Sequence, residues 1–357
     1  MRIPESRGPA SGVLVDLLAR SGGSTPERDS LRVSVEEAIA ATEDIFRDDD
    51  LQITLFLLYQ LGYGGVDGGD ELEWDLTLLG ARAAIEAALE DGLRDRVPVP
   101  ERTEPDAESV ATALFSLTAE DSGPSLSRFV AKKATDEQLR ELLVLRSIYA
   151  LKEADPQSWA IPRLEGRAKA ALVEILADEY GGGRARRMHS TIFAGAMAGL
   201  GLESDDGAYL DSAPALAVAS VNVMSLFGLH RRLRGASIGL FAAYEMTSSL
   251  PNRQYGNGVR RLGYGDEVAW YFDEHVEADA VHEQIAARDM AGGLVEAEPH
   301  LLDDVLFGAA AGLTVDGWLG EDVFRAWSAG TSALRRPLPA ASPEHAAQTD
   351  ARDARPA

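Results

Sequence analysis

Apolar residues recur at intervals of three and four along most of this sequence, with polar and charged residues between them. This spacing puts an apolar stripe along one side of a helix and is typical of amphipathic α-helices. The alternating pattern of half-buried strands is nearly missing. The predicted helices cover residues 33–46, 51–61, 71–93, 107–117, 136–152, 166–180, 187–200, 213–250, 256–290 and 301–329. The pattern therefore predicts an all-α protein with long helices and short connections.

Three stretches interrupt the helical pattern. Residues 1–30 are rich in Gly, Ser, Pro and Arg, which predicts a flexible N-terminus. Residues 331–357 hold mostly Ala, Pro, Arg and Asp with almost no large apolar side chain, which predicts a disordered tail. Residues 97–105 contain three prolines and are the best candidate for a linker between two helical parts.

The composition argues against several classes of function. With 34 Lys and Arg against 58 Asp and Glu, the 357-residue chain carries a formal net charge of −24. We therefore expect no nucleic-acid partner and no membrane partner, because both surfaces attract clustered positive charge. Cysteine is absent, which excludes disulfides, iron–sulfur clusters and thiolate metal sites. The basic run at 230–234 is expected to be a solvated face.

The sequence also bears on location. The longest apolar stretches, at 55–61 and 213–221, fall well short of the roughly 20 residues that a membrane span needs. The first residues lack the apolar region and cleavage site of a secretory signal. We therefore expect a cytoplasmic protein.

The most informative stretch is the predicted helix around residues 273–282. His275, Asp279 and His282 lie within roughly 60° of one another on such a helix, so two imidazoles and a carboxylate share one stripe. Nitrogen and oxygen donors of this kind suit non-haem iron, manganese or zinc. The alternative is a solvated acidic helix whose histidines are incidental.

One helix cannot complete a metal site, and Glu245 is the leading partner. It follows the apolar residues 238–244, where a lone carboxylate is costly unless it is paired or bound to a metal. The alternative is a pairing with Arg253, Arg260 or Arg261 at a helix end.

Two further candidates, Glu179 and His189, are separated by ten residues. An unbroken helix would hold them about 15 Å apart along its axis, so they can share a site only if the chain bends. The three glycines at 181–183 offer that freedom. Glu153 comes at the end of the predicted helix 136–152 and is a weaker signal, because it could equally be a surface residue.

Together these candidates comprise four carboxylates and three imidazoles, which is more than one metal ion needs and about right for two irons. The Glu-x-x-His motif of ferritin-like bundles is approximated only by residues 279–282. An ordinary ferritin fold is therefore disfavoured.

In this ordered set of motifs, residues 139–329 resemble the haem-oxygenase-like di-iron oxidases and oxygenases, and more narrowly the actinobacterial proteins described as iron-containing redox enzymes. The motifs that carry the resemblance are Arg146-Ser147-Ile148-Tyr149, residues 152–156, residues 178–183 with His189, Tyr244-Glu245, and His275-x3-Asp279-x2-His282. The resemblance implies a haem-oxygenase-like helical bundle over 131–330, with residues 31–130 as an additional N-terminal helical region.

The resemblance also implies a site. Its metal ligands fall on Glu153, Glu179, His189, Glu245, His275, Asp279 and His282. It implies two irons (Fe) per chain, O2 as co-substrate, and a small-molecule substrate of the amino-acid, amine or fatty-acid type. Either Glu179 or Glu245 could bridge the irons.

Partners and alternative functions follow from the same features. Without cysteine there is no internal iron–sulfur relay, so electrons must come from an external reductant, an electron-donor protein or the substrate. The region 31–130 is either an accessory domain or a dimerisation element, which leaves a homodimer open. The alternatives to a di-iron enzyme are a metal-free enzyme of this fold, similar to cofactorless oxidases or thiaminases, and a non-catalytic helical binding protein. Haem binding would need only one axial histidine and would leave the clustered carboxylates without a purpose.

Overall fold

The computed structural model describes residues 1–20, 25–119 and 125–338; the side chains of residues 25–27 and 277–280 lie outside that description. The described residues form α-helices joined by short 3-10 turns and loops, and they contain no strand. The predicted all-α class is therefore confirmed for the described residues. No helix among the described residues has both the length and the apolar character needed to cross a bilayer.

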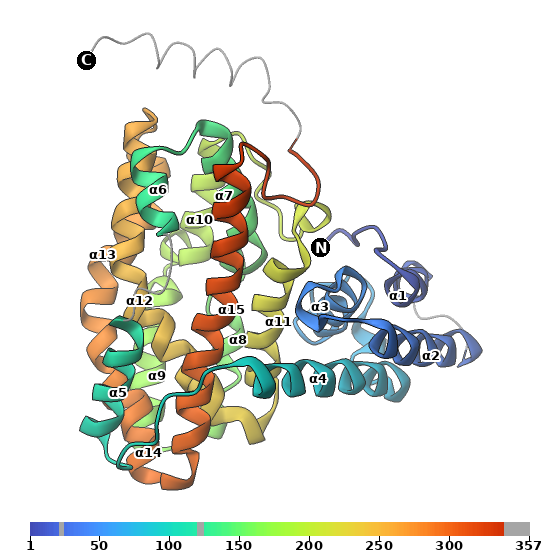
Figure 1. Cartoon of the computed structure of the whole chain (residues 1–357), viewed down its shortest axis with the longest axis horizontal. Coiled ribbons are helices and arrows are strands. Elements are labelled where there is room, and N and C mark those ends of the chain that lie inside the picture. The colour runs from blue at the N-terminus through green and yellow to red at the C-terminus, as the bar shows by residue number, and fades with distance from the viewer. Residues whose placement is uncertain (21–24, 120–124, 339–357) are drawn as a thin grey trace.

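The helices form a long bundle with a smaller layer of N-terminal helices against one side (Figure 1). The N-terminal helices are α1 (Pro9–Ala19), α2 (Thr25–Ala41), α3 (Asp49–Gly62) and α4 (Leu76–Arg96). Two helices, α5 (Ala107–Ala119) and α6 (Leu126–Lys132), lie along the bundle. The bundle itself comprises α7 (Asp136–Ala150), α8 (Asp155–Ser158), α9 (Gly166–Glu179), α10 (His189–Gly199), α11 (Ala215–Leu229), α12 (Arg234–Arg261), α13 (Asp266–Gln284), α14 (Gly293–Ala297) and α15 (Leu302–Ser328). A π-helical segment, Ile285–Gly292, joins α13 to α14.

Helix α3 attaches the N-terminal layer to the bundle. Its residues from Asp50 to Leu61 are all buried, and it packs against α11. The side-chain amide of Asn222 on α11 donates to the backbone carbonyl of Gln52 at 2.9 Å and to its side-chain oxygen at 2.8 Å. Because apolar side chains of both parts form one continuous core, the N-terminal region is packed into the rest of the protein.

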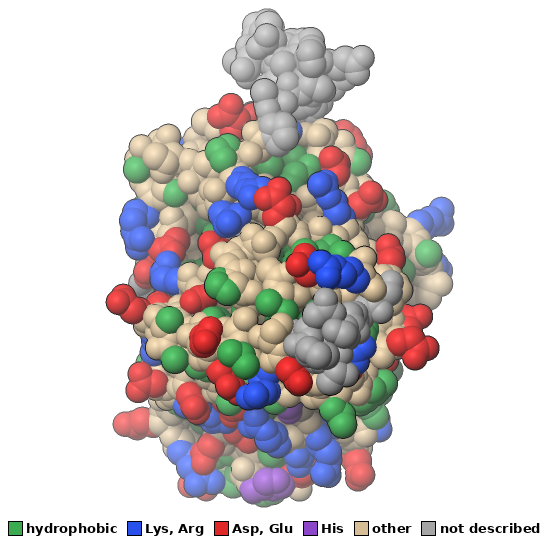
Figure 2. Space-filling model, turned by 90° about the vertical axis from the view of Figure 1, so that its right-hand side faces the viewer, with side chains coloured by type: hydrophobic (Ala, Val, Ile, Leu, Met, Phe, Trp, Pro, Cys, Tyr) green, Lys and Arg blue, Asp and Glu red, His purple; other side chains and the backbone are tan. Residues whose placement is uncertain are grey.

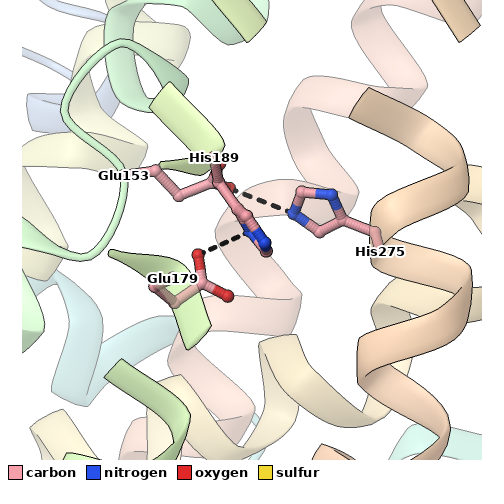
Figure 3. Close-up of side chains that lie close together, drawn as sticks. All are labelled: Glu153, Glu179, His189 and His275. Carbon is pink, nitrogen blue, oxygen red and sulfur yellow. Dashed lines mark ion pairs between the residues drawn. The ribbon is translucent and has the colours of Figure 1, made fainter. Parts of the chain in front are cut away.

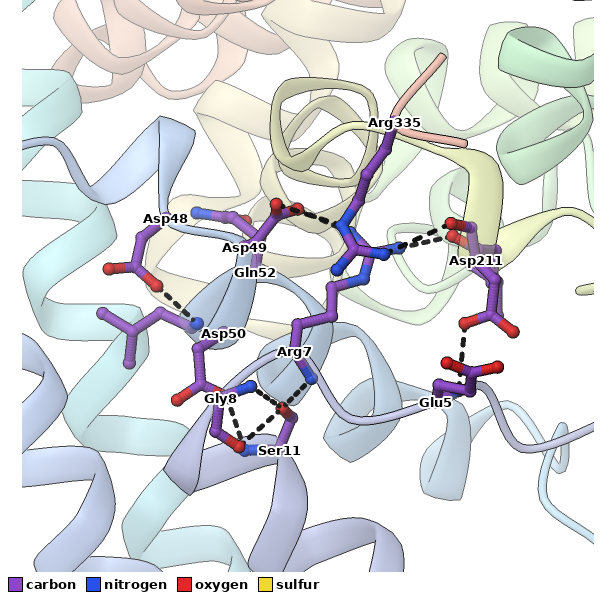
Figure 4. Close-up of polar contacts among 12 residues, drawn as sticks. Glu5, Arg7, Gly8, Ser11, Asp48, Asp49, Asp50, Gln52, Asp211 and Arg335 are labelled. Atoms are coloured by element: carbon purple, nitrogen blue, oxygen red, sulfur yellow. Dashed lines mark hydrogen bonds and ion pairs between the residues drawn. The ribbon is translucent and has the colours of Figure 1, made fainter. Parts of the chain in front are cut away.

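The N-terminus is ordered where the sequence predicted a flexible lead-in. Helix α1 starts at Pro9, and its Leu14 and Leu17 are buried. The carboxylate of Asp50 accepts hydrogen bonds from the backbone N–H groups of Ala10 and Ser11, at 2.9 and 2.7 Å. Figure 4 shows Asp50 beside Ser11. This carboxylate supplies the helix start with an acceptor that its own N-cap glycine lacks. The predicted flexibility of residues 1–30 is therefore wrong for the described part of that range.

The chain after α15 is also held in place for several residues. Leu334 is buried, the N–H of Ala333 donates to Glu141 at 2.9 Å, and Arg335 pairs with Asp49 at 3.2 Å. The predicted disordered tail, residues 331–357, is thus wrong up to residue 338. Residues 339–357 lie outside the described structure.

Two of the longest predicted helices are each divided. The predicted helix 213–250 breaks at His230, which ends α11 and pairs with the buried Glu86 of α4 at 2.9 Å. The next basic residue, Arg232, pairs with Glu90 on the same helix. His230 and Arg232 therefore hold the N-terminal layer against the bundle, while Arg231 and Arg232 stay exposed, so the prediction of a solvated face holds only for part of the run 230–234. The predicted helix 256–290 breaks at residues 262–265, between α12 and α13.

Helices α12 and α15 cross at very close range. A Cβ added to Gly239 on α12 would overlap the carbonyl of Val305 on α15, and one added to Gly308 on α15 would overlap the carbonyl of Ala236. Glycine is therefore required at both positions to let the two backbones touch. The crossing fixes α12, which carries one of the candidate metal ligands, Glu245.

Candidate metal centre

Six of the seven predicted ligands meet inside the bundle in two groups that share one member. The first group contains Glu153, Glu179, His189 and His275, and the second contains Glu179, Glu245 and His282; within each group the ligand atoms all lie within 4.8 Å of one another. Glu179 is the member common to both groups. The seventh candidate, Asp279, has its side chain outside the described residues.

A sharp reversal of the chain brings Glu179 and His189 together. Glu179 is the last residue of α9 and His189 is the first of α10. The glycines between them, at 181–183, have φ values of 67°, 59° and 75°, in the left-handed region that favours glycine. The Nδ1 atom of His189 lies 2.9 Å from Oε2 of Glu179, as Figure 3 shows.

Glu153 and His275 make the second pair of the first group. Glu153 lies in the turn after α7, and its Oε1 is 3.5 Å from Nε2 of His275 on α13 (Figure 3). The Nδ1–H of His275 donates to the carbonyl of Tyr271 at 2.7 Å, which turns Nε2 towards Glu153. The hydroxyl of Tyr271 lies 3.0 and 3.1 Å from the two oxygens of Glu153 and donates to this carboxylate.

The electrostatics of this pair favour its charged form. Burial by itself would raise the pKa of Glu153, but His275, His189 and Arg146 together lower it below its ordinary value. Burial would likewise lower the pKa of His275, but the carboxylate of Glu153 raises it above the ordinary value. Glu153 and His275 therefore each stabilise the charged form of the other. A metal cation beside Glu153 would stabilise its carboxylate in the same way.

The second group is completed by Glu245 of α12 and His282 near the end of α13. The Nδ1 atom of His282 lies 3.1 Å from Oε2 of Glu245. Its Nε2 atom lies 3.1 Å from the carboxylate of Asp178, which neighbours the shared Glu179. The carboxylate of Asp178 on Nε2 fixes the orientation of the His282 ring and increases the basicity of Nδ1, the nitrogen that faces Glu245.

Comparison with known proteins confirms the predicted family and its haem-oxygenase-like helical fold. Residues 140–317 match the model of the family described as iron-containing redox enzymes. This part of the chain belongs to the iron-containing redox enzymes. The segment contains all seven candidate ligands and runs from α7 into α15.

A nitrosourea synthase from Streptomyces achromogenes subsp. streptozoticus is 31% identical to this iron-containing redox enzyme over 150 residues. The aligned region is 41% of this chain and 31% of the nitrosourea synthase. The match thus spans about a third of that relative's length, and it says nothing about the rest of either protein.

The donor set of this family member fits iron. Glu179, Glu245, His189, His275 and His282 are each at most 7% exposed. Buried carboxylates are costly unless a cation compensates them, and here the Nδ1 atom of His189 faces the buried carboxylate of Glu179 at 2.9 Å. Carboxylate oxygens and imidazole nitrogens, with no thiolate, are donors that ferrous iron accepts. The shared position of Glu179 suits a carboxylate that bridges two metal ions.

A cavity of about 800 Å³ reaches the metal centre. Its lining includes four of the candidate ligands, namely Glu153, Glu179, Glu245 and His275. Away from the ligands it is lined by Arg146, Tyr149, Tyr244, Tyr255, Asp316 and several apolar side chains. A space of this size can enclose a small organic molecule.

Several residues of the site had no assigned role in the sequence. Tyr271 and Asp178 orient candidate ligands, but their role depends on contacts between helices far apart in the chain. Arg146 stands in a motif of the family resemblance, yet nothing local indicates that it faces a cavity. Asp316 lies in an amphipathic helix among other acidic residues, and only the tertiary structure distinguishes it from them.

Proposed function

We propose that this chain is a non-haem di-iron oxidase or oxygenase that uses O2 to oxidise a small metabolite. The observation that supports the proposal best is the pair of buried ligand groups that share Glu179. Membership in the iron-containing redox enzymes supports iron as the metal.

In this proposal one iron is held by Glu153, Glu179, His189 and His275, and the other by Glu179, Glu245 and His282. Iron bound by these residues would supply electrons for the reduction of O2, and an external reductant or donor protein would be their source. Glu179 would be the ligand common to both metal positions, because it belongs to both groups. Neutral imidazoles complete the coordination without adding charge.

The protein's own groups prepare the site in three ways. The carbonyl of Tyr271 holds the proton of His275 on Nδ1, so that Nε2 is available as a ligand. The hydroxyl of Tyr271 donates to Glu153 and fixes the direction of that carboxylate. The carboxylate of Asp178 contacts Nε2 of His282 and orients the ring so that Nδ1 faces Glu245.

Titration of the iron-free protein with Fe(II) under anaerobic conditions tests this proposal. Iron that remains bound after gel filtration should reach two ions per chain, and mixing with O2 should then give a transient absorption change. We expect His189→Ala and His282→Ala each to retain about one iron, because each removes a ligand from one group only. Glu179→Ala should weaken both positions.

The control is His300→Ala. The side chain of His300 is 69% exposed and belongs to neither ligand group. It should bind iron as the unchanged protein does. The proposal fails if the protein retains less than one iron per chain, or if His300→Ala lowers the iron content as much as the ligand variants do.

A further inference from the structure

The cavity beside the candidate metal centre is lined by an arginine that has no anionic partner among the described residues. Arg146 of α7 lines the cavity and makes no hydrogen bond or ion pair with any described residue. Its guanidinium lies 5.1 Å from the centre of the Tyr255 ring, which supports the cation from one side only. A guanidinium enclosed by protein is costly to leave unpaired, because its five N–H donors prefer a planar anion.

An acid of opposite charge lines the same cavity. Asp316 of α15 forms no ion pair with Arg146 within 4.0 Å, although each affects the pKa of the other. Burial raises the pKa of Asp316 to about 6, while Arg146 and the Tyr244 hydroxyl act in the opposite direction. The acid is therefore mostly ionised at pH 7.5. A cation and an anion thus face one space without neutralising each other.

The rest of the lining combines apolar side chains with polar ones such as Thr247, Ser248 and Asn252. Apolar side chains contributed by four helices cover the walls between the charged residues and the ligands, and they include Leu142, Leu145, Val221, Met224, Phe241 and Leu313. Because the same cavity reaches Glu153, Glu179 and His275, a molecule held at the charged residues can extend towards the metal centre.

We propose that this cavity binds an α-amino acid, or a derivative with a free α-carboxylate and ammonium group, with the carboxylate on Arg146 and the ammonium group on Asp316. The side chain of the amino acid then points along the apolar walls to the metal centre. A fatty acid would leave the carboxylate of Asp316 without a cation, and a simple amine would leave the guanidinium of Arg146 without an anion. That the bound amino acid is oxidised rests on the proposed function. That it binds rests on the cavity alone.

Binding to the iron-free full-length protein tests the inference without any activity measurement. Isothermal titration calorimetry is run with each of the twenty standard L-amino acids at millimolar concentration, and with hexylamine and decanoate as one-charge probes. At least one amino acid should bind, and it should bind more tightly than either one-charge probe. The inference is overturned if no amino acid binds, or if decanoate or hexylamine binds as tightly as the best amino acid.

Three variants assign the contacts. Arg146→Met keeps most of the side-chain length and should weaken amino-acid binding about 10- to 100-fold, because a charged hydrogen-bonding partner is lost. Asp316→Asn keeps the shape and should weaken amino-acid binding by a similar factor, while it improves decanoate binding. Arg325→Met is the control, since this arginine is 73% exposed on α15, and it should change nothing.

Iron content and far-ultraviolet circular dichroism are measured for every variant. Normal iron content with binding that Arg146→Met does not affect overturns this inference and leaves the proposed function standing. Amino-acid binding that depends on Arg146, in a protein that takes up no iron, supports the inference and refutes the di-iron function.

Discussion

The close crossing of α12 and α15 makes a quantitative prediction about stability. Both Gly308 and Gly320 lie within α15, so the same change to alanine can be made twice in one helix. At Gly308 an added Cβ would lie 2.5 Å from the carbonyl carbon of Ala236 and closer still to its oxygen, well inside the 3.4 Å at which ordinary contact begins. At Gly320 nothing lies within 4 Å of the added atom.

The two changes should therefore have opposite signs. Because the obstacle at Gly308 is the backbone of another helix, the two helices must separate, and overpacking of this kind costs about 1–3 kcal/mol. Gly320→Ala only reduces the freedom of the unfolded chain and should stabilise by about 0.5–1 kcal/mol. We expect the two variants to differ by about 1.5–4 kcal/mol in the free energy of unfolding.

Urea unfolding followed by circular dichroism at 222 nm measures this difference, provided that the slope of the transition stays unchanged. A second readout is iron uptake, since separation of α12 from α15 displaces Glu245. If Gly308→Ala and Gly320→Ala unfold within about 0.5 kcal/mol of each other, the helices do not touch as described and the reasoning is refuted.

Three further predictions concern the chain reversal, the docking of the N-terminal layer and the acid in the cavity. Gly181→Ala should reduce iron uptake far more than Gly183→Ala. Both positions have positive φ, but only at Gly181 would the added Cβ lie against backbone, 2.5 Å from the carbonyl carbon of Arg187. An equal loss of bound iron in the two variants would contradict this prediction. His230→Ala removes the imidazole that pairs with the buried Glu86 and should lower the free energy of unfolding, measured in urea, by about 1–3 kcal/mol. The double variant His230→Ala/Glu86→Gln should recover part of this loss. If it recovers none, the pairing does not stabilise the protein as described. Because the pKa of Asp316 rises from 3.8 to about 6 on folding, the iron-free native state binds more protons in that range, so stability falls as the pH increases through it. Asp316→Asn removes this dependence, and its stability relative to the unchanged protein should increase from pH 4 to pH 7 in urea titrations.

Features that depend on local periodicity were predictable from the sequence. The spacing of apolar residues indicated helices because each helix buries one stripe, and the described residues are indeed helical. The placement of His275 and His282 on one stripe needed only the geometry of a single helix. The chain reversal between Glu179 and His189 was also foreseeable, since three consecutive glycines permit left-handed backbone that other residues avoid.

Features that depend on distant partners were not predictable. Helix α1 forms where the sequence suggested a flexible segment, because Asp50, forty residues along the chain, accepts the free N–H groups at its start. The break at His230 has a similar cause, since its partner Glu86 lies 144 residues away. The local pattern of apolar residues indicates neither partner. Periodicity alone therefore predicts no helix at α1 and one continuous helix through His230.

The same distinction applies within the metal centre. The sequence identified carboxylates and imidazoles by residue type but could not choose between Glu179 and Glu245 as the bridge, because that choice depends on how α9 and α12 lie relative to α13. In the structure Glu179 belongs to both ligand groups, whereas Glu245 belongs to one. Glu179 occupies this position because α9 ends there, so its carboxylate sits at the point where the chain turns back to deliver His189. The glycine turn therefore places Glu179 and His189 side by side, so this short segment contributes to both candidate ligand groups.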